Sequence, residues 1–306
     1  MLNPRQQWAC ILDVTDLCNR HPACSNCTRA CGHGPEPYIV SPDDFRKMCR
    51  AVADFATDSE PDRGNPPRNN GFKGIGFIGG EPTMHPQFEE LCAIFREEIP
   101  DRRNRCLFSG WRPGRDKYLK VIQETFGPGS GWNEHNPPSV HQPLLVAIDE
   151  LVPDKTEMWN LIDRCWVQNI WCNGSRSTGF YFCEVASTLD WVLFGGIHGF
   201  PLEPGIWRHD IGYFKEQIEL LCPHCGGAAP LPPRLDCDGI DDISPGNLEI
   251  LAARGSPRVK AGHYKVFDCN GYSKEKYGKN WVPNLYRSEQ RYGPQVAQQL
   301  AETKKL

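Results

Sequence analysis

The chain lacks the features that would place it in a membrane or on nucleic acid. No stretch of its 306 residues reaches the roughly 18 consecutive apolar residues that a membrane-spanning helix needs. The net charge is −4, from 34 basic and 38 acidic residues, so no basic excess is present to attract a phosphate backbone. Residues 1–7 are polar and do not form the apolar segment of a secretory signal peptide. These absences predict a cytoplasmic protein with neither a membrane nor a nucleic acid as partner.

Cysteine, by contrast, is abundant, with 15 residues. Because the cytoplasm keeps thiols reduced, a disulfide framework is not expected. Some cysteines lie among apolar neighbours and are interpreted as small core residues: Cys10, Cys49, Cys92 and Cys106. Most of the others fall into two groups, and thiols crowded together in a reduced protein indicate a bound metal or cluster.

Strand-like and helix-like segments alternate through the first half of the chain. Short apolar runs predict strands at residues 8–14, 73–78, 106–108 and 144–148. Amphipathic segments predict helices that begin near Pro42 and Pro86, followed by helices at residues 116–126 and 155–166. The connections have crossover length, which predicts a mainly parallel sheet with helices outside.

Polar or glycine-rich residues follow each predicted strand at its carboxyl end. Cys18 comes after the first strand, Gly79 to Pro82 after the second, Ser109 after the third, and Asp149 with Glu150 after the fourth. Parallel α/β sheets carry their binding and catalytic residues at this edge. We therefore expect the functional site to lie there.

The first thiol group follows the first predicted strand and contains Cys18, Cys24, Cys27 and Cys31. Several thiolates from one loop suit a tetrahedral zinc ion, which His21 or His33 could also help to bind. They suit an iron–sulfur cluster equally well. Spacing alone leaves both possibilities open.

The end of the second strand carries a motif of its own, Gly-Gly-Glu-Pro at residues 79–82. On its own this segment is interpreted as a strand-to-helix turn. Together with Asp-x-Thr-x-x-Cys-Asn from Asp13 to Asn19 and the Cys24-x2-Cys27 pair, it resembles the radical S-adenosylmethionine (SAM) enzymes. The resemblance covers roughly residues 8–150, with both motifs at the expected strand ends and in the expected order.

The resemblance implies an α/β fold, a partial (βα)6-type TIM barrel over residues 1–165, followed by a cysteine-rich auxiliary region over residues 166–306. In that family three cysteines hold a [4Fe–4S] cluster and leave one iron open for SAM. By match, the three ligands here are Cys18, Cys24 and Cys27.

The resemblance also implies where SAM binds. The methionine part of SAM is expected to lie along Gly79, Gly80, Glu81 and Pro82, with Ser109 as a further contact. A protein such as flavodoxin or ferredoxin is expected to supply the electron.

The chain departs from the family's pattern at two places. The usual spacing is C-x3-C-x2-C, whereas five residues separate the first two cysteines here, Asn19 to Ala23. The residue before the last cysteine is usually aromatic and contacts adenine, and here it is Asn26. Cys31 offers a second register, Cys24-x2-Cys27-x3-Cys31, and we prefer the first.

The second thiol group is predicted to contain Cys172, Cys183, Cys222 and Cys225. Its pattern resembles the auxiliary-cluster module of the SPASM/twitch type, which implies a second [4Fe–4S] cluster. The alternative is a zinc site that uses Cys222 and Cys225 with other donors. The donors that could complete this zinc site are Cys237, Cys269 or His224. Three cysteines remain spare, and any of them could replace one of the four cluster ligands: Cys165, Cys237 and Cys269.

The resulting hypothesis is a radical SAM enzyme of the oxidoreductase type. It would cleave SAM reductively to a 5′-deoxyadenosyl radical and remove a hydrogen atom from a small molecule or a peptide, for an oxidation, a dehydrogenation or a cross-link. No cobalamin-binding region is recognised, which argues against methyl transfer. The alternative hypothesis is a zinc-stabilised, cysteine-rich binding protein without SAM chemistry.

Overall fold

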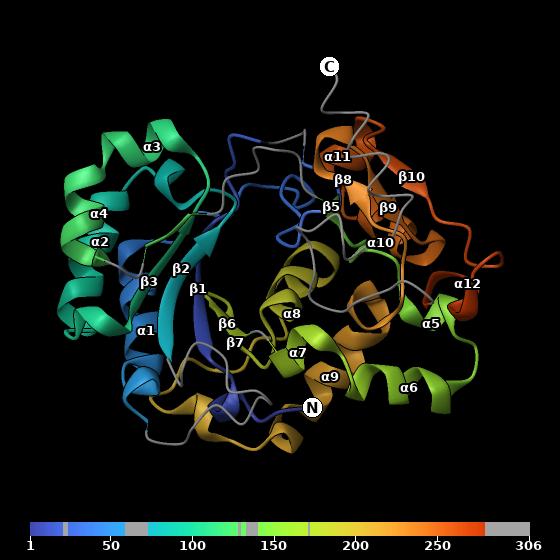
Figure 1. Ribbon diagram of the computed structural model, residues 1–306, viewed down its shortest axis with the longest axis horizontal. Helices are drawn as coiled ribbons and strands as arrows, with labels where there is room; N and C mark the ends of the chain where they lie inside the picture. The colour runs from blue at the N-terminus through green and yellow to red at the C-terminus, as the bar shows by residue number, and fades with distance from the viewer. Residues whose placement is uncertain (21–23, 59–72, 128–129, 133–139, 171, 279–306) are drawn as a thin grey trace.

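A computed structural model describes residues 1–20, 24–58, 73–127, 130–132, 140–170 and 172–278 (Figure 1). Its centre is a six-stranded sheet with the strand order β4-β3-β2-β1-β6-β7. All neighbouring strands in this sheet are parallel except β6 and β7, which form an antiparallel pair. Its strands are β1 (Ala9–Thr15), β2 (Gly74–Gly79), β3 (Arg105–Ser109), β4 (Ser130–Trp132), β6 (Cys172–Arg176) and β7 (Gly179–Tyr181).

Strand β1 lies inside the sheet, where Ile11 pairs with Gly76 of β2 on one side and with Gly174 of β6 on the other. The chain moves outward from β1 to β4 and then returns to the far side of β1 at β6. A mainly parallel α/β sheet is therefore confirmed. The predicted partial TIM barrel is not confirmed, because consecutive strands of such a barrel are neighbours and β6 would not be expected beside β1. The carboxyl ends of β1 and β6 instead flank a point where the strand order reverses, which is where open α/β sheets bind ligands.

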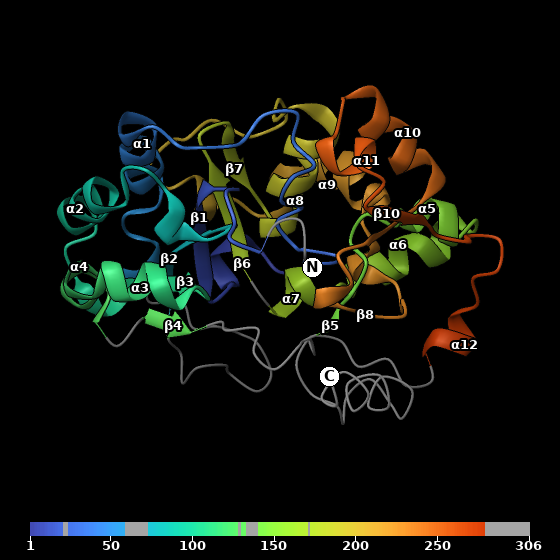
Figure 2. The ribbon, with the colours of Figure 1, turned by 90° about the horizontal axis from the view of Figure 1, so that it is seen from above.

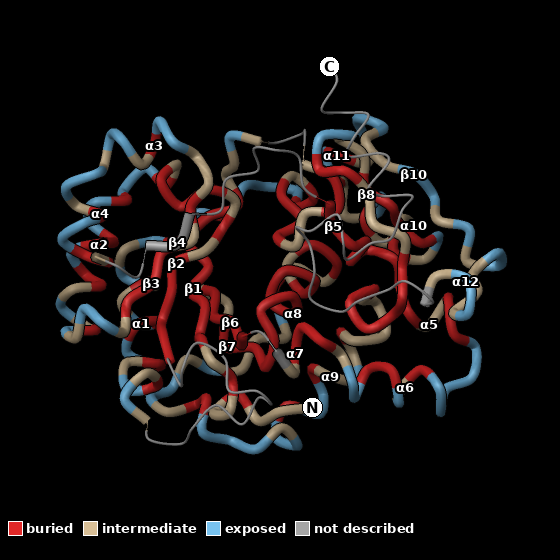
Figure 3. The backbone as a smooth tube through the Cα atoms, in the orientation of Figure 1, coloured by how far each residue is buried: buried red, intermediate tan, exposed pale blue. Residues whose placement is uncertain are grey.

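Helices α1 (Pro42–Val52), α2 (Phe88–Glu98), α3 (Arg112–Lys117) and α4 (Leu119–Thr125) lie on one side of the sheet, and the labelled helices after β7 lie on the other (Figures 1 and 2). The segment after β7 first passes α1, where the Gly205 nitrogen donates to the Ala51 carbonyl at 3.0 Å. Side chains alternate along β1, so Cys10, Leu12 and Val14 belong to the main hydrophobic core while Ala9 and Ile11 face away from it. Figure 3 shows the strands buried and the outer surfaces of these helices exposed.

The start of α1 follows its sequence signal. The Ser41 hydroxyl accepts a hydrogen bond from the Asp44 backbone nitrogen, and Pro42 occupies the first turn. Two other predicted helices are divided: residues 116–126 fall into α3 and α4, and residues 155–166 fall into α6 (Lys155–Asp163) and α7 (Trp166–Ile170).

The strand predicted at residues 144–148 is wrong. Ile148 begins a short helix, α5 (Ile148–Leu151), and the fourth strand of the sheet is β4, in a segment for which no strand was predicted. The apolar run is buried all the same, because Val146, Ile148 and Leu151 pack with Ala228, Ala229 and Leu231. A short apolar run signals burial without distinguishing a strand from other buried structure.

The rest of the described chain forms short elements around two small sheets. Strand β5 pairs antiparallel with β8, and β9 pairs parallel with β10. Since β6 and β7 belong to the central sheet, residues beyond 166 also complete it, and the division at residue 165 stays a prediction. Within the described residues no helix is long and apolar enough to cross a membrane. These elements are β5 (Val140–His141), α8 (Glu184–Leu189), α9 (Lys215–Leu221), β8 (Arg234–Leu235), β9 (Asp241–Ile243), α10 (Pro245–Ala253), α11 (Pro257–Lys260), β10 (Tyr264–Val266) and α12 (Lys274–Gly278).

Candidate functional site

The cysteine loop leaves the carboxyl end of β1 and returns to it. The Asp16 backbone nitrogen donates to the Tyr38 carbonyl at 3.0 Å, and the Tyr38 nitrogen donates to the Asp16 carboxylate at 2.8 Å. The Thr15 hydroxyl also donates to the Tyr38 carbonyl, at 3.0 Å. These bonds close residues 16–38 into a loop whose two ends are fixed on the strand.

All four cysteines of this loop belong to one group of thiols. The sulfur atoms of Cys27 and Cys31 lie 4.0 Å apart, and each of the four thiols shifts the pKa of at least one other. Hydrogen bonds from neighbouring thiols hold the pKa of Cys18 and of Cys27 below the ordinary thiol value. Thiolates are the form that binds metals, so these two are the first available as ligands. Cys18, Cys24 and Cys27 therefore lie together, and Cys31 lies with them.

The backbone of the loop adopts an uncommon conformation at two residues other than glycine. Asn26 has a φ of 48° and Ala30 a φ of 43°, which is the left-handed region. Such a conformation costs about 1–3 kcal/mol per residue and persists only where surrounding contacts hold it. The two residues immediately precede Cys27 and Cys31, so the strained backbone directs those two thiols.

Asn26, which stands where the family usually has an aromatic residue, ties the loop to β9. Its backbone nitrogen donates to the Asp241 carboxylate at 2.5 Å and its amide nitrogen to the Asp242 carboxylate at 3.0 Å, while its amide oxygen accepts from the Asp242 nitrogen at 2.8 Å. The side chain is buried, and these bonds explain how a polar residue is accommodated there. The loop is thus clamped by the C-terminal region, and His33 adds a 2.8 Å contact to Asp241.

The Gly-Gly-Glu-Pro turn packs directly against the start of the cysteine loop. The Gly80 nitrogen donates to the Thr15 carbonyl and the Glu81 nitrogen to the Leu17 carbonyl, both at 2.7 Å. A Cβ atom at Gly79 would lie 2.2 Å from the Thr15 carbonyl oxygen, and one at Gly80 would lie 2.4 Å from that of Leu17. Only glycine allows the two backbones to approach so closely. The two motifs, far apart in the sequence, therefore form one backbone unit.

We expect Gly80→Ala to disturb this unit. The added Cβ would force the start of the cysteine loop to move, at a cost of about 1–3 kcal/mol. The expected result is a lower free energy of unfolding and a reduced metal content after anaerobic reconstitution. Gly212→Ala is the matched control, because a Cβ there meets nothing within 4 Å. Equal stability and metal content in the two variants would contradict the packing described here.

Glu81 joins the ends of β2 and β3. One carboxylate oxygen accepts from the Ser109 hydroxyl at 2.8 Å and from the Thr83 nitrogen at 3.1 Å, and the other accepts from the nitrogens of Gly110 and Trp111 at 2.9 and 3.1 Å. The carboxylate is buried, and these bonds use most of its accepting capacity. Glu81 and Ser109 thus hold each other and the turn in place. Their contact with SAM stays a prediction.

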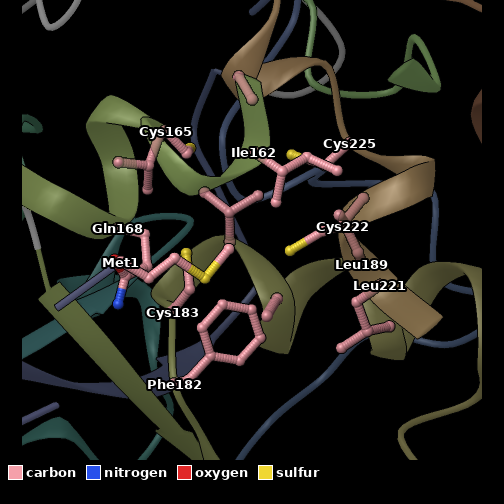
Figure 4. A pocket seen from close by; sticks show the side chains of 14 residues that line it. Met1, Ile162, Cys165, Gln168, Phe182, Cys183, Leu189, Leu221, Cys222 and Cys225 are labelled. Carbon is pink, nitrogen blue, oxygen red and sulfur yellow. The ribbon is translucent and has the colours of Figure 1, made fainter. Parts of the chain in front are cut away.

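The second thiol group lines a small pocket that is partly open to solvent. Cys165, Cys183, Cys222 and Cys225 all line it, and Figure 4 shows their side chains around this one pocket. The remaining walls are mainly apolar, from residues such as Phe182 and Leu221. Burial raises the pKa of Cys225 to about 12 and raises the pKa of the other three thiols as well. Without a metal these thiols stay protonated, so metal binding must release protons.

Cys172, predicted for this group, does not line the pocket. It lies at the start of β6, fully buried, and its thiol donates to the Glu184 carboxylate at 2.9 Å. Cys165, regarded from the sequence only as a spare, lies beside the pocket instead. Of the other two spares, Cys237 is exposed and Cys269 packs near α6.

A buried polar network connects the two thiol groups. Arg29, between Cys27 and Cys31 in the loop, pairs with Asp13 at the end of β1 and donates to the Glu184 carbonyl at 3.1 Å. Glu184 directly follows Cys183. Arg176 at the end of β6 also pairs with Asp13, at 2.8 Å, so the switch point between β1 and β6 carries one carboxylate and two guanidinium groups.

Sequence reasoning missed several residues of this region. Arg29, Arg176, Glu184 and His141 carry no motif, and His141 lies 3.7 Å from the Cys24 sulfur. Of these residues, only Arg29 could have been singled out from the sequence, because it is a basic residue that lies between two cysteines.

Within the described part of the chain, no group of three or more His, Cys, Asp or Glu side chains is arranged to hold a metal ion. A single zinc ion would therefore require the thiols of either group to move closer together. A four-iron cluster is larger than one ion and accommodates thiolates that stand further apart. Four buried or half-buried thiols in each group fit such a cluster by the chemistry of their donors.

Comparison with known proteins shows a distant likeness to a solved structure. No family model and no curated protein matches the chain. Among solved structures, the chain is similar to the crystal structure of BtrN in complex with AdoMet and 2-DOIA, at 16% sequence identity and a TM-score of 0.42, over 72% of this chain and 92% of that one. The functional assignment rests on the chain's own residues.

Proposed function

We propose that this protein is a radical SAM enzyme. Cys18, Cys24 and Cys27 would hold a [4Fe–4S] cluster, and SAM would bind at the remaining iron along the turn from Gly79 to Pro82. The observation that carries the proposal is the direct backbone contact between this turn and the start of the cysteine loop. A structural turn alone would not require two consecutive glycines against the residues that lead to the first thiol.

When bound, the cluster supplies the electron that splits SAM into methionine and a 5′-deoxyadenosyl radical, which removes a hydrogen atom from the substrate. The chain's own residues position the reactants and exclude water. Glu81 fixes the ends of β2 and β3, Asn26 holds the loop against β9, and the backbone at Ala30 is held in its strained form. The site is thereby rigid before SAM arrives, which reduces the cost of ordering it.

We further propose a second [4Fe–4S] cluster held by Cys165, Cys183, Cys222 and Cys225. Cys165 replaces Cys172 in the set expected from the sequence, because Cys165 lines the pocket and Cys172 does not. A cluster with four thiolates has no open iron for SAM, so its use is to accept an electron. The network from Arg29 to Glu184 connects the two groups. This arrangement favours an oxidation, dehydrogenation or cross-linking of a small molecule or a peptide, with a flavodoxin or ferredoxin as electron donor to the first cluster.

One observation favours the alternative, a zinc-stabilised binding protein. Zinc–sulfur bonds of about 2.3 Å in a tetrahedron place the sulfur atoms roughly 3.8 Å apart. The 4.0 Å between the sulfur atoms of Cys27 and Cys31 is close to that value. A zinc-stabilised binding protein does not explain the Gly-Gly-Glu-Pro turn, because the turn would then have no ligand to bind.

A single preparation separates the two functions. The protein is purified and reconstituted without oxygen, analysed for iron, sulfide and zinc, and incubated with SAM and dithionite. We expect roughly four irons with matching sulfide at each thiol group, and formation of 5′-deoxyadenosine. Zinc without sulfide, or iron-loaded protein that forms no 5′-deoxyadenosine, would rule out the proposed function.

A further inference from the structure

The fourth cysteine of the loop has no role in a three-thiolate site, yet the structure places it beside an assigned ligand. The Cys31 sulfur lies 4.0 Å from that of Cys27. The sulfur of Cys24, itself an assigned ligand, lies 3.7 Å from Nδ1 of His141. By its contact with Cys27, Cys31 is at least as well placed as Cys24.

The backbone around Cys31 holds its side chain toward the group. Ala30 has a φ of 43°, and its nitrogen donates to the Cys27 carbonyl at 2.9 Å, which turns the chain back on itself. The Gly32 carbonyl then accepts from the Arg258 nitrogen at 3.2 Å. A cysteine used only to fill the core would not require a strained residue directly before it. The thiol is buried, with 5% of the residue exposed, so its position is fixed by these contacts.

A cluster with three thiolates needs a further ligand at one iron. SAM supplies its amino and carboxylate groups when it is present. Without SAM, that iron would be open to water and oxygen. Resting on the proposed function, we propose that Cys31 binds this iron when SAM is absent and is displaced when SAM arrives. On displacement the bond between iron and the Cys31 sulfur breaks, the SAM ammonium group gives up a proton that the Cys31 thiolate takes up, and the SAM amino nitrogen and carboxylate oxygen form the new bonds to iron. No electron is transferred in this exchange.

The test compares how fast the cluster loses iron without SAM. Reconstituted wild-type protein, Cys31→Ala and Cys92→Ala are treated with ferricyanide, which takes one electron from a [4Fe–4S] cluster and leaves [3Fe–4S] after release of one Fe²⁺. The electron paramagnetic resonance (EPR) signal of [3Fe–4S] is followed over time. Cys92 is the control because it is a buried thiol on α2, outside both thiol groups.

We expect Cys31→Ala to assemble the cluster and to lose iron about tenfold faster than wild type and Cys92→Ala, the order of effect seen when a contact that supports a metal site is removed. Added SAM should return the rate of Cys31→Ala to that of wild type, because SAM occupies the same iron. Cys31→Ser should lie in between, since a hydroxyl is the poorer ligand for iron.

Two results would overturn the inference: equal rates in Cys31→Ala and wild type, or a folded Cys31→Ala that assembles no cluster, which would make Cys31 an obligatory ligand. If Cys31→Ala does not fold, as judged by circular dichroism, the rate of Cys31→Ser decides, and a wild-type rate overturns the inference. Wild-type protein that holds zinc and no sulfide would instead be a failure of the proposed function, so the two failures are distinguishable.

Discussion

Replacing Cys18, Cys24 or Cys27 with alanine is expected to abolish SAM cleavage. Even residues that only support a metal ligand change affinity or activity by about 10–100-fold, so loss of a ligand should cost more than ~100-fold in 5′-deoxyadenosine formation. Each variant should also lose roughly four irons, while the second thiol group keeps its own. The measurement is 5′-deoxyadenosine by chromatography beside iron and sulfide analysis of the same sample.

The matched control for these variants is Cys92→Ala, which removes a buried thiol from α2 and leaves both thiol groups intact. It should retain SAM cleavage. The choice of ligands is wrong if one of the three alanine variants cleaves SAM at the wild-type rate. In particular, full activity in Cys18→Ala would favour the register of Cys24, Cys27 and Cys31.

The second large effect, a loss of iron, is expected when a cysteine that lines the pocket of the second thiol group is replaced. Cys165→Ala should remove roughly four irons, because the cluster would lose one of its four thiolates and the rest of the pocket lining is mainly apolar. SAM cleavage at the first group should continue, since its ligands are untouched. Turnover that needs the second cluster as electron acceptor should stop.

Cys172→Ser is the control for Cys165→Ala, because it keeps a donor for the Glu184 carboxylate and lies outside the pocket. Iron and sulfide should remain at the wild-type level in this variant. Loss of iron in Cys172→Ser together with full iron content in Cys165→Ala would restore the ligand set expected from the sequence. That outcome would show that the pocket does not hold the cluster.

Much of the first half of the fold could be predicted because its signals are local. Ser41 with Pro42 predicted the start of α1, and the short apolar run at residues 8–14 predicted a buried strand. The position of β6 beside β1 could not be predicted in this way. The pairing of Ile11 with Gly174 joins residues far apart in the sequence, and no local pattern encodes it.

The candidate site shows the same contrast between local and long-range information. The first thiol group is contained in one loop, so its spacing in the sequence also describes its neighbours in space. The second group is drawn from the residue before α8, the turn after α9 and the residue before α7, and sequence order did not distinguish Cys165 from Cys172. The two cysteines are close together in the chain, and only the structure shows that Cys165 is half-buried beside the pocket while Cys172 is fully buried against Glu184.

Asn26 illustrates a departure from a family pattern that the structure explains. An aromatic residue at this position could not form the two hydrogen bonds that the Asn26 side chain makes with Asp242. Its φ of 48° also suits asparagine better than a bulky residue. In this protein the residue at this position attaches the cysteine loop to β9.

The central claim is that the loop cluster keeps one iron for SAM. It is tested most directly by electron–nuclear double resonance of the reduced protein with SAM labelled with ¹⁵N at its amino group. The account predicts a ¹⁵N coupling to the cluster, together with a change in the cluster's EPR signal when SAM is added. A reduced cluster whose EPR signal is unchanged by SAM, with no ¹⁵N coupling, would contradict it.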